Sequence, residues 1–294
     1  MTLFLSALTA GLAIGSIYGL VGIGYTVVFN ATRIFNLAQG DLVMVAVMTS
    51  YYLIELRHAP QIVAFVLVVL FVALISVVEE RVIVRPFLKR GPNVFGWFIA
   101  TLGFATIVET VVVIQFGNRP ISGIRSPFPE QGFHIGSLVI DYRNMFVFLV
   151  FIAVIVALEL FQRRTWTGQA MRATSEDRET VSLLGINPAA MSQRAFLMAG
   201  VLAGIAGFVI APITFSDPTI GLNFTLKGFL ALAIGGFGSI RGAIAGGLTL
   251  GVAEQMFDLY GDAKYEIVVA LVLVLGVLLV RTEGLFRNKA TRTV

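Results

Sequence analysis

Residues 60–80 read PQIVAFVLVVLFVALISVVEE, and this stretch indicates the fold class. It has no charged residue from Gln61 to Val78, and a helix of about 20 apolar residues spans the hydrocarbon core of a bilayer. The whole chain has the same character, because 57% of its 294 residues are hydrophobic, 13% are charged and the mean hydropathy is +0.90. Soluble domains carry about 25% charged residues, and a single soluble core would leave much of this apolar surface in water. We therefore predict an all-α polytopic membrane protein with one transmembrane domain over residues 1–294.

Eight further stretches share this apolar character, so we expect eight or nine transmembrane helices, of which two could be half-helices. The nine ranges are 3–29, 37–54, 60–80, 95–116, 144–161, 195–213, 225–237, 242–257 and 265–281. The segment 235–247 has too many glycines for an ordinary lipid-facing helix, and a broken or re-entrant turn is allowed at membrane depth where protein surrounds it. The sequence GSI occurs at both 15–17 and 238–240, which suggests an inverted repeat.

The distribution of lysine and arginine predicts the orientation. One set of loops holds fifteen of these residues and the opposite set holds six, and loops rich in them stay in the cytoplasm. The N-terminus would then lie outside and the C-terminus inside, as an odd number of crossings requires. The larger set is Arg33, Arg81, Arg85, Lys89, Arg90, Arg163, Arg164, Arg172, Arg178, Arg194, Arg241, Arg281, Arg287, Lys289 and Arg292; the smaller is Arg57, Arg119, Arg125, Arg143, Lys227 and Lys264. This bias also accounts for the net charge of +4 without a nucleic-acid partner.

Two loops are long enough to have a function of their own. Residues 117–143 form the predicted periplasmic loop, which is either a plain connector or an ordered loop or short hairpin that contacts a partner. Residues 162–193 form the predicted cytoplasmic loop, in which a short helix is expected from about Ser175 to Leu184. Acidic residues at 176 and 177 favour its N-terminus, and Gly185 can end it in the left-handed conformation.

The predicted cytoplasmic helix is amphipathic. Ala173, Val181 and Leu184 recur at helical spacing on one side, and charged residues lie elsewhere around it. Such a helix can lie on lipid headgroups or insert its apolar side into a groove of another protein. Its mixed charge favours the protein, because a helix that binds anionic lipid is mostly basic.

Three blocks of sequence resemble the leucine/isoleucine/valine ABC permease family. Residues 165–188, TWTGQAMRATSEDRETVSLLGINP, are similar to its cytoplasmic loop, which opens T-x-x-G-x-A-x-R-A and closes L-x-G-I-N. Residues 11–41 resemble its opening, G-x-x-x-G-x-x-Y-x-L followed by R-x-x-N-x-A-x-G-[DE], and residues 227–254 resemble its glycine-rich block. The chain departs from the family at Gln39, where many members have His, and at Arg241 and Thr282, where Pro is common. These differences bear on the substrate rather than on the fold.

The resemblance implies a single permease domain of an ATP-binding-cassette importer in the bacterial inner membrane. Its cargo would be branched-chain or related small amino acids, delivered by a periplasmic binding protein. The implied partners are two ATP-binding subunits, a second permease subunit that is identical or homologous, the binding protein and the lipid bilayer. Relatives that carry urea, amides or aromatic acids leave other substrates open, and a self-sufficient proton-coupled carrier is a further alternative.

In such importers the cytoplasmic loop seats in the ATPase subunit, so the resemblance assigns it the coupling role. The residues expected to take part are Arg172, Ala173, Glu176, Asp177, Val181, Leu184, Gly185, Ile186 and Asn187.

Polar groups at membrane depth form the candidate translocation pathway. Ionisable and amide side chains are costly there and usually have a function, although a structural hydrogen bond between helices is the alternative for each glutamate. Glycines at small-xxx-small spacing allow close helix packing, which is the alternative to lining a pathway. The candidates are Ser16, Tyr18, Asn36, Gln39, Asp41, Glu109, Gly235, Gly236, Gly238 and Glu254.

The residue inventory argues against catalysis by this chain. It has no cysteine, so disulfides, thiolate metal sites and cysteine nucleophiles are excluded. Its two histidines, His58 and His134, fall in predicted loops far apart in sequence, and we expect no metal site, cofactor or catalytic residue. No G-x-x-x-x-G-K-[ST] loop is present to bind ATP phosphates. The chain is therefore predicted to be a transport subunit, with ATP hydrolysis on a separate polypeptide.

Overall fold

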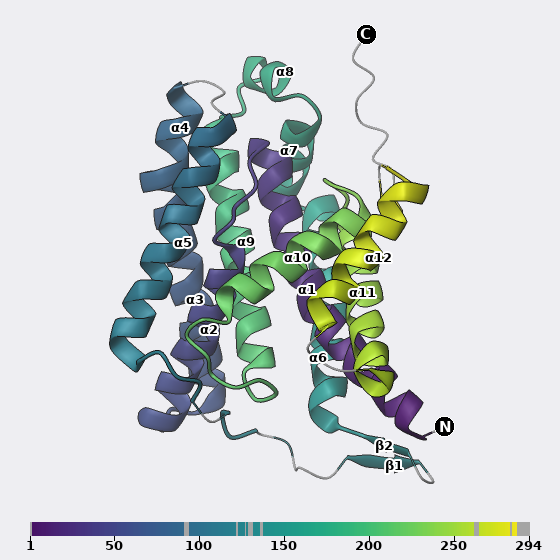
Figure 1. Ribbon diagram of the computed structural model, residues 1–294. Coiled ribbons are helices and arrows are strands. Elements are labelled where there is room, and N and C mark those ends of the chain that lie inside the picture. The colour runs from purple at the N-terminus through teal and green to yellow at the C-terminus, as the bar shows by residue number, and fades with distance from the viewer. Residues whose placement is uncertain are drawn as a thin grey trace.

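The computed structural model describes residues 2–90, 94–121, 123–126, 128, 132–135, 138–261, 265–282 and 284–286. In this part the chain forms a bundle of helices with a two-stranded hairpin at one end (Figure 1). The hairpin consists of β1 (Phe133–Ile135) and β2 (Leu138–Ile140), and its end of the bundle is called the hairpin end. The opposite end carries α7 (Trp166–Glu176) and α8 (Arg178–Leu183) and is called the α7–α8 end.

A helix occupies each of the nine stretches predicted to span the membrane. The remaining helices, in chain order, are α1 (Thr2–Thr32), α2 (Gln39–Tyr51), the π-helical turn η1 (Tyr52–Leu56), α3 (Gln61–Glu79), the π-helical turn η2 (Glu80–Val84), α4 (Arg85–Arg90), α5 (Val94–Phe116), α6 (Tyr142–Arg164), α9 (Pro188–Ile210), α10 (Gly221–Gly235), α11 (Ile240–Tyr260) and α12 (Glu266–Val280). Among the described residues, five helices are long and apolar enough to cross a membrane: α1, α5, α6, α9 and the continuous stretch Gln61–Phe87, which comprises α3, η2 and the start of α4. The pair α10 and α11 meets the same criterion together. The all-α polytopic architecture is therefore confirmed. The expected count of eight or nine spanning helices is not, because five described helices meet this criterion alone and the bent pair brings the number to six, whereas α2 and α12 are too short.

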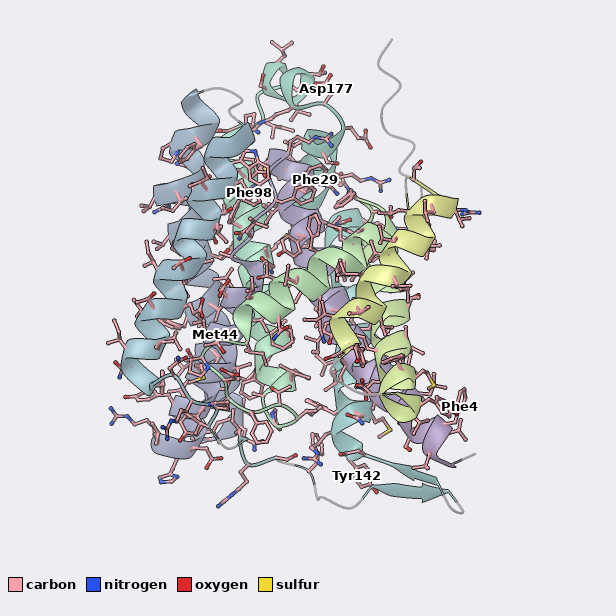
Figure 2. All side chains as sticks on the ribbon, in the orientation of Figure 1. Phe4, Phe29, Met44, Phe98, Tyr142 and Asp177 are labelled. Atoms are coloured by element: carbon pink, nitrogen blue, oxygen red, sulfur yellow. The ribbon has the colours of Figure 1, made fainter. Side chains whose placement is uncertain are left out.

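The helices divide into a buried centre and an apolar periphery. α2 is almost wholly inside the protein, and Met44 is fully buried there, whereas Phe98 on α5 is 44% exposed (Figure 2). α3, α5, α6 and α12 also expose many large apolar side chains, for example Ile62, Ile107 and Leu279. Such contiguous apolar surface is stable against lipid and not against water.

α1 and α11 pack backbone to backbone at the centre of the bundle. A Cβ atom built on Gly15 would lie 2.7 Å from the carbonyl oxygen of Gly247, and one built on Gly11 would lie 2.9 Å from that of Gly251. Small residues at this spacing let two membrane helices approach closely. The glycine face of α1 is thus used for packing. The inverted repeat between residues 15–17 and 238–240 stays a prediction.

α10 and α11 are two arms of one bent unit, as expected for half-helices. They meet at 115° across the short break at 236–239. Gly236 and Gly238 have φ values of 104° and 77°, which side chains other than glycine rarely adopt. Ser239 then begins α11, because its hydroxyl accepts a hydrogen bond from the amide of Gly242 at 3.0 Å.

The C-terminal segment binds to this bend. The amides of Leu285 and Phe286 donate hydrogen bonds of 2.9 Å to the carbonyl oxygens of Ile234 and Gly235. These carbonyls belong to the last turn of α10, and the carbonyl groups in the last turn of a helix have no hydrogen-bond donor within that helix. Residues 284–286 are called the C-terminal strap.

The predicted periplasmic loop contains the short hairpin that was one of its two expected forms. β1 and β2 pair antiparallel with Phe133 opposite Ile140. After the hairpin, Asp141 begins α6 by accepting a hydrogen bond of 2.8 Å from the amide of Arg143. Burial acts to raise the pKa of Asp141, but the hydrogen bonds and charge of Arg143 outweigh it and lower that pKa.

Candidate functional site

The predicted cytoplasmic loop contains two helices, not one. α7 ends at Glu176, and Asp177 has an extended backbone between α7 and α8 (Figure 2). The Asp177 carboxylate accepts a hydrogen bond of 3.0 Å from the amide of Thr180, as a residue that caps a helix N-terminus does. The expected continuous helix from Ser175 is therefore wrong at its start. Its end is confirmed, because Gly185 has a φ of 81° and Pro188 is the first residue of α9.

The apolar face predicted for this helix is also wrong. Ala173 lies on α7, Val181 on α8 is 4% exposed, and Leu184 beyond α8 is 74% exposed, so the three do not share a side. The break at Asp177 causes the difference, since it ends the helical register that would have aligned them. The exposed apolar side chains at this end are instead Leu183 and Leu184, with Trp166 at the start of α7.

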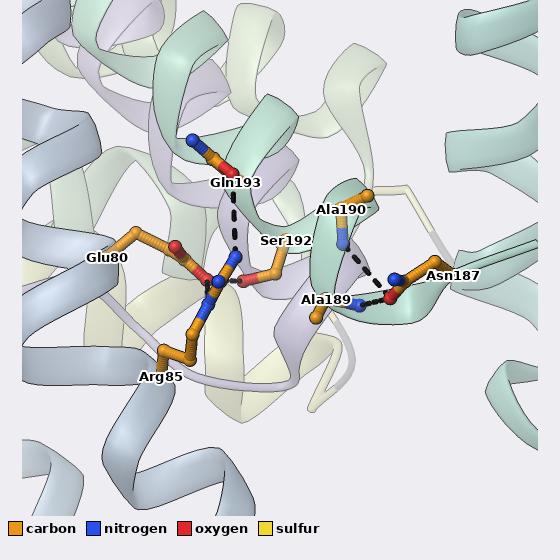
Figure 3. A network of polar contacts seen from close by, with 7 residues as sticks. All are labelled: Glu80, Arg85, Asn187, Ala189, Ala190, Ser192 and Gln193. Atoms are coloured by element: carbon orange, nitrogen blue, oxygen red, sulfur yellow. Dashed lines mark hydrogen bonds and ion pairs between the residues drawn. The ribbon is translucent and has the colours of Figure 1, made fainter.

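The other residues expected to couple to an ATPase lie around this surface. Arg172, Ala173 and Glu176 of α7 line a polar hollow together with the last turn of α6. Ile186 follows the left-handed Gly185, and the Asn187 side chain caps α9 by accepting a hydrogen bond of 2.9 Å from the amide of Ala189 (Figure 3). The loop therefore passes directly into a membrane-spanning helix.

Three of the predicted pathway residues lie together where α2 begins. Asn36, Gln39 and Asp41 are all buried. The Asn36 amide donates a hydrogen bond of 3.0 Å to Glu79 Oε2, and the Gln39 amide donates one of 3.1 Å to the carbonyl oxygen of Ala199 on α9. Asn36, Gln39, Asp41 and Glu79 are called the Asp41 cluster.

The Asp41 cluster is built where the first turns of two helices meet. A Cβ atom on Gly40 would overlap the backbone of Gly221 and Thr225, and one on Gly221 would overlap the Asp41 carboxylate. Thr225 Oγ1 accepts a hydrogen bond of 3.2 Å from the amide of Gly40 and donates one of 3.2 Å to the carbonyl oxygen of Leu37. Asp41 thus lies in the first turn of α2, and its carboxylate lies against the first residue of α10, where the positive ends of helices favour a negative charge.

Glu79 and Glu80 are buried acidic residues that the sequence did not single out. Both are fully buried where α3 passes into η2, although they end a predicted span and were therefore expected at the membrane surface. Glu80 Oε1 accepts a hydrogen bond of 3.1 Å from Ser192 and pairs with Arg85 at 3.4 Å (Figure 3). The acidic pair itself is the sequence signal that could have identified them, because an acidic residue at the end of a spanning helix can face the interior of the bundle as well as water.

Tyr18 and Glu254 belong to a second polar cluster. Lys227 Nζ donates hydrogen bonds to the Tyr18 hydroxyl at 2.9 Å and to Glu254 Oε2 at 3.1 Å, and it also pairs with Glu266 of α12. These four residues are called the Lys227 cluster. Lys227 was expected near the outer surface, but it lies within α10, and its side chain is only 11% exposed. A buried ammonium group requires such partners, because an unpaired charge away from water is costly.

Of the five remaining predicted pathway residues, Glu109 lies near the Asp41 cluster and the other four lie apart from both clusters. The Ser16 hydroxyl is satisfied within α1 by the carbonyl oxygen of Leu12 at 2.6 Å. Gly235, Gly236 and Gly238 form the end of α10 and the bend. Glu109 is partly exposed on α5, close enough to Asp41 for the two charges to interact.

α10 connects the two polar clusters. Its first residue, Gly221, touches Asp41, and Lys227 six positions later belongs to the other cluster. At 1.5 Å per residue these positions are about 9 Å apart along the helix. Helices interrupted at membrane depth, with polar groups at their ends, are how transporters hold a polar cargo.

Comparison with known proteins decides the family. The family model described as the permease component of branched-chain amino acid transport systems matches residues 7–280. The chain belongs to this family. The match runs from residue 7 in α1 to the end of α12, so it includes the predicted cytoplasmic loop and both polar clusters of this permease.

Relatives are similar to the permease over almost its whole length. The permease protein BraD of a high-affinity branched-chain amino acid transport system in Pseudomonas aeruginosa is 33% identical over 297 residues, which cover 96% of this chain and 95% of that one. LivH of Escherichia coli K12, of a system with the same description, is 31% identical over 296 residues, with 96% and 95% covered. LivH of Methanocaldococcus jannaschii is 24% identical over 280 residues, with 90% and 87% covered.

Proposed function

We propose that this permease imports branched-chain amino acids across the bacterial inner membrane, driven by ATP hydrolysis on separate subunits. The observation that carries the ATP-driven part is the surface formed by α7 and α8. Leu183 and Leu184 are 87% and 74% exposed there, beside the charged hollow of α7. Two exposed leucines with charged residues beside them suit a groove on another protein better than a lipid surface.

The proposed orientation places the α7–α8 end in the cytoplasm and the hairpin end in the periplasm. Three residues of the predicted basic loops lie at the α7–α8 end: Arg33 bonds to α7, Arg163 is in the last turn of α6 just before α7, and Arg85 begins α4, which lies at that end of the bundle (Figure 1). Because Lys227 lies within α10 and not in an outer loop, it no longer counts against this assignment. The periplasmic binding protein would then deliver its cargo at the hairpin end.

The proposed pathway follows α10 between the two polar clusters. A zwitterionic amino acid needs acceptors for its ammonium group and donors for its carboxylate. The carboxylates of Asp41 and Glu254 supply acceptors, and Lys227 and the first turns of α2 and α10 supply donors or positive partial charge. Glu109, Ser16, Tyr18, Asn36, Gln39 and the glycines at 235, 236 and 238 remain the other proposed lining or packing residues.

The assembly we propose has two such permease subunits, identical or homologous, two ATPase subunits and one binding protein. ATP binding would move the ATPases and the docked α7–α8 surface, and the permease would change between outward and inward openings. This works only if ATP and the loaded binding protein favour different permease conformations.

The test is reconstitution in proteoliposomes with the ATPase subunits and binding protein encoded beside this chain. We expect ATP-dependent accumulation of labelled leucine, isoleucine or valine, and none from the permease alone. Uptake by the isolated permease under an imposed pH gradient would instead identify a proton-coupled carrier. Competition by excess urea, amide or aromatic acid, with no effect of leucine, would replace the proposed cargo.

A further inference from the structure

The segment that joins α1 to α2 has an unusual start. Arg33 ends α1 with a φ of 61°, and its amide donates to the carbonyl oxygen of Phe29 at 2.7 Å. This is the left-handed position after a helix, where glycine is strongly favoured. A residue with a side chain is strained in this conformation, and it persists when something else requires its side chain.

The Arg33 side chain reaches the cytoplasmic loop. Its Nη2 atom donates a hydrogen bond of 2.7 Å to the carbonyl oxygen of Ser175, in the last turn of α7. A guanidinium group at a helix C-terminus is favoured by both the free carbonyls and the helix dipole. α1 and α7 are therefore joined by a charge-assisted hydrogen bond at the α7–α8 end.

The other end of the same segment is held inside the membrane part. Asn36 donates to Glu79 at 3.0 Å and accepts from the amide of Ala38 at 3.0 Å, and Gln39 donates to the carbonyl oxygen of Ala199 at 3.1 Å. Asn36 is only three positions after Arg33, and at about 3.5 Å per residue this stretch reaches no more than about 10 Å. The segment has little slack between its two anchors.

These anchors belong to different parts of the molecule. Glu79 is in α3, which is bound to α9 through Ser76 and the carbonyl oxygen of Phe196 at 2.7 Å and through the Glu80–Ser192 hydrogen bond (Figure 3). α3 and α9 thus form one block, on which α1 also packs, and Arg33 adds a bond from the end of α1 to α7. Through this bond a displacement of α7 relative to the block acts directly on residues 33–39.

We propose that Arg33 is the positioning residue that carries movement of the cytoplasmic loop to the Asp41 cluster. The inference rests on the proposed ATP-driven function. When a docked ATPase moves α7, Arg33 moves the start of the 33–39 segment, and Asn36, Gln39 and the first turn of α2 follow. The side chain is retained at a strained position because it makes this connection.

The experiment compares Arg33→Ala, Arg33→Gly and Arg33→Lys in the reconstituted complex. We expect Arg33→Ala to assemble and hydrolyse ATP while uptake per ATP falls about tenfold, the loss that corresponds to one charge-assisted hydrogen bond. Arg33→Gly should lose as much, although glycine relieves the backbone, and Arg33→Lys should lose less because it keeps a charged donor. Arg119→Ala, at an exposed arginine of the hairpin end, is the matched control and should behave as wild type.

A second measurement follows the segment directly. In the wild-type complex, trapping the ATPases with nucleotide should change amide hydrogen exchange in peptides that cover residues 34–42, and in Arg33→Ala this change should disappear. Wild-type uptake per ATP together with an intact exchange response in Arg33→Ala would overturn the inference. If Arg33→Ala fails to assemble, Arg33→Lys decides by the same two readouts. Absence of ATP-driven uptake by the wild-type complex would refute the proposed function instead.

Discussion

At the scale of single residues, the contact between α1 and α11 leaves no room for a methyl group. Gly15→Ala would place its Cβ atom 2.7 Å from the carbonyl oxygen of Gly247, where backbone must move. Overpacking of this kind costs about 1–3 kcal/mol, so we expect a lower unfolding temperature of the purified protein in detergent, followed by tryptophan fluorescence.

The control for this substitution is Gly276→Ala on α12. Nothing lies within 4 Å of the added methyl group there, and alanine is the better helix former by about 0.5–1 kcal/mol. Its unfolding temperature should equal or slightly exceed that of wild type. Equal stability of the Gly15 and Gly276 variants would contradict the close packing described above.

Single polar residues were the least predictable part of the candidate pathway. Asn36, Gln39 and Asp41 could be grouped from sequence, because they are adjacent at the start of one span. Lys227 and Glu79 could not be placed, since their partners lie far away in the chain: those of Lys227 are on α1, α11 and α12, and that of Glu79 is Asn36, before α2. Only the packed bundle decides whether a charge near the end of a span faces water or a buried partner.

At the scale of elements, α7 and α8 present the surface that we expect to bind an ATPase. The double substitution Leu183→Ser and Leu184→Ser removes two exposed apolar side chains whose burial is worth about 1.5–3 kcal/mol each. We expect the ATPase subunits to be lost from the purified complex, or retained at least tenfold more weakly, while the permease stays folded. Co-purification and binding of the isolated ATPase measure this.

The matched control is Leu56→Ser, an exposed leucine in η1 toward the hairpin end. It removes the same chemical group and should leave ATPase binding unchanged. Binding that survives the double substitution at full strength would mean that the ATPase uses another surface.

The existence of a helix in this loop could be predicted, but not its division. The stretch from Ser175 to Leu184 suits a helix by composition, and Gly185 marks its end correctly. Asp177 is equally suited to begin a helix, and in the structure its carboxylate accepts a hydrogen bond from the amide of Thr180 at the start of α8. Local propensity allowed both outcomes, and the wrong one also misplaced the apolar face.

At the scale of the whole molecule, the orientation can be tested because the chain has no cysteine of its own. We expect Arg119→Cys, at the hairpin end, to react with a membrane-impermeant maleimide in intact spheroplasts. Leu184→Cys, beyond α8, should react only after the membrane is permeabilised. The opposite pattern would invert the proposed topology and place the docking surface outside.

The architecture as a whole was the most predictable feature. Every stretch expected to span the membrane holds a helix, but the number of spans was overestimated, because α2 and α12 are too short and α10 and α11 together form one bent unit. The arrangement of α10 and α11 was predictable only as a possible break, because Gly236 and Gly238 permit a bend without setting its angle.

The C-terminal strap has a practical consequence for labelling this protein. Leu285 and Phe286 are hydrogen-bonded to the last turn of α10, so a fluorescent reporter or purification tag fused directly after residue 286 would be held beside the bend. A large or rigid fusion partner there would strain the hydrogen bonds to the carbonyl oxygens of Ile234 and Gly235. A tag on the opposite terminus avoids this strain, because the first turn of α1 is exposed at Leu3 and Phe4, beside the hairpin end.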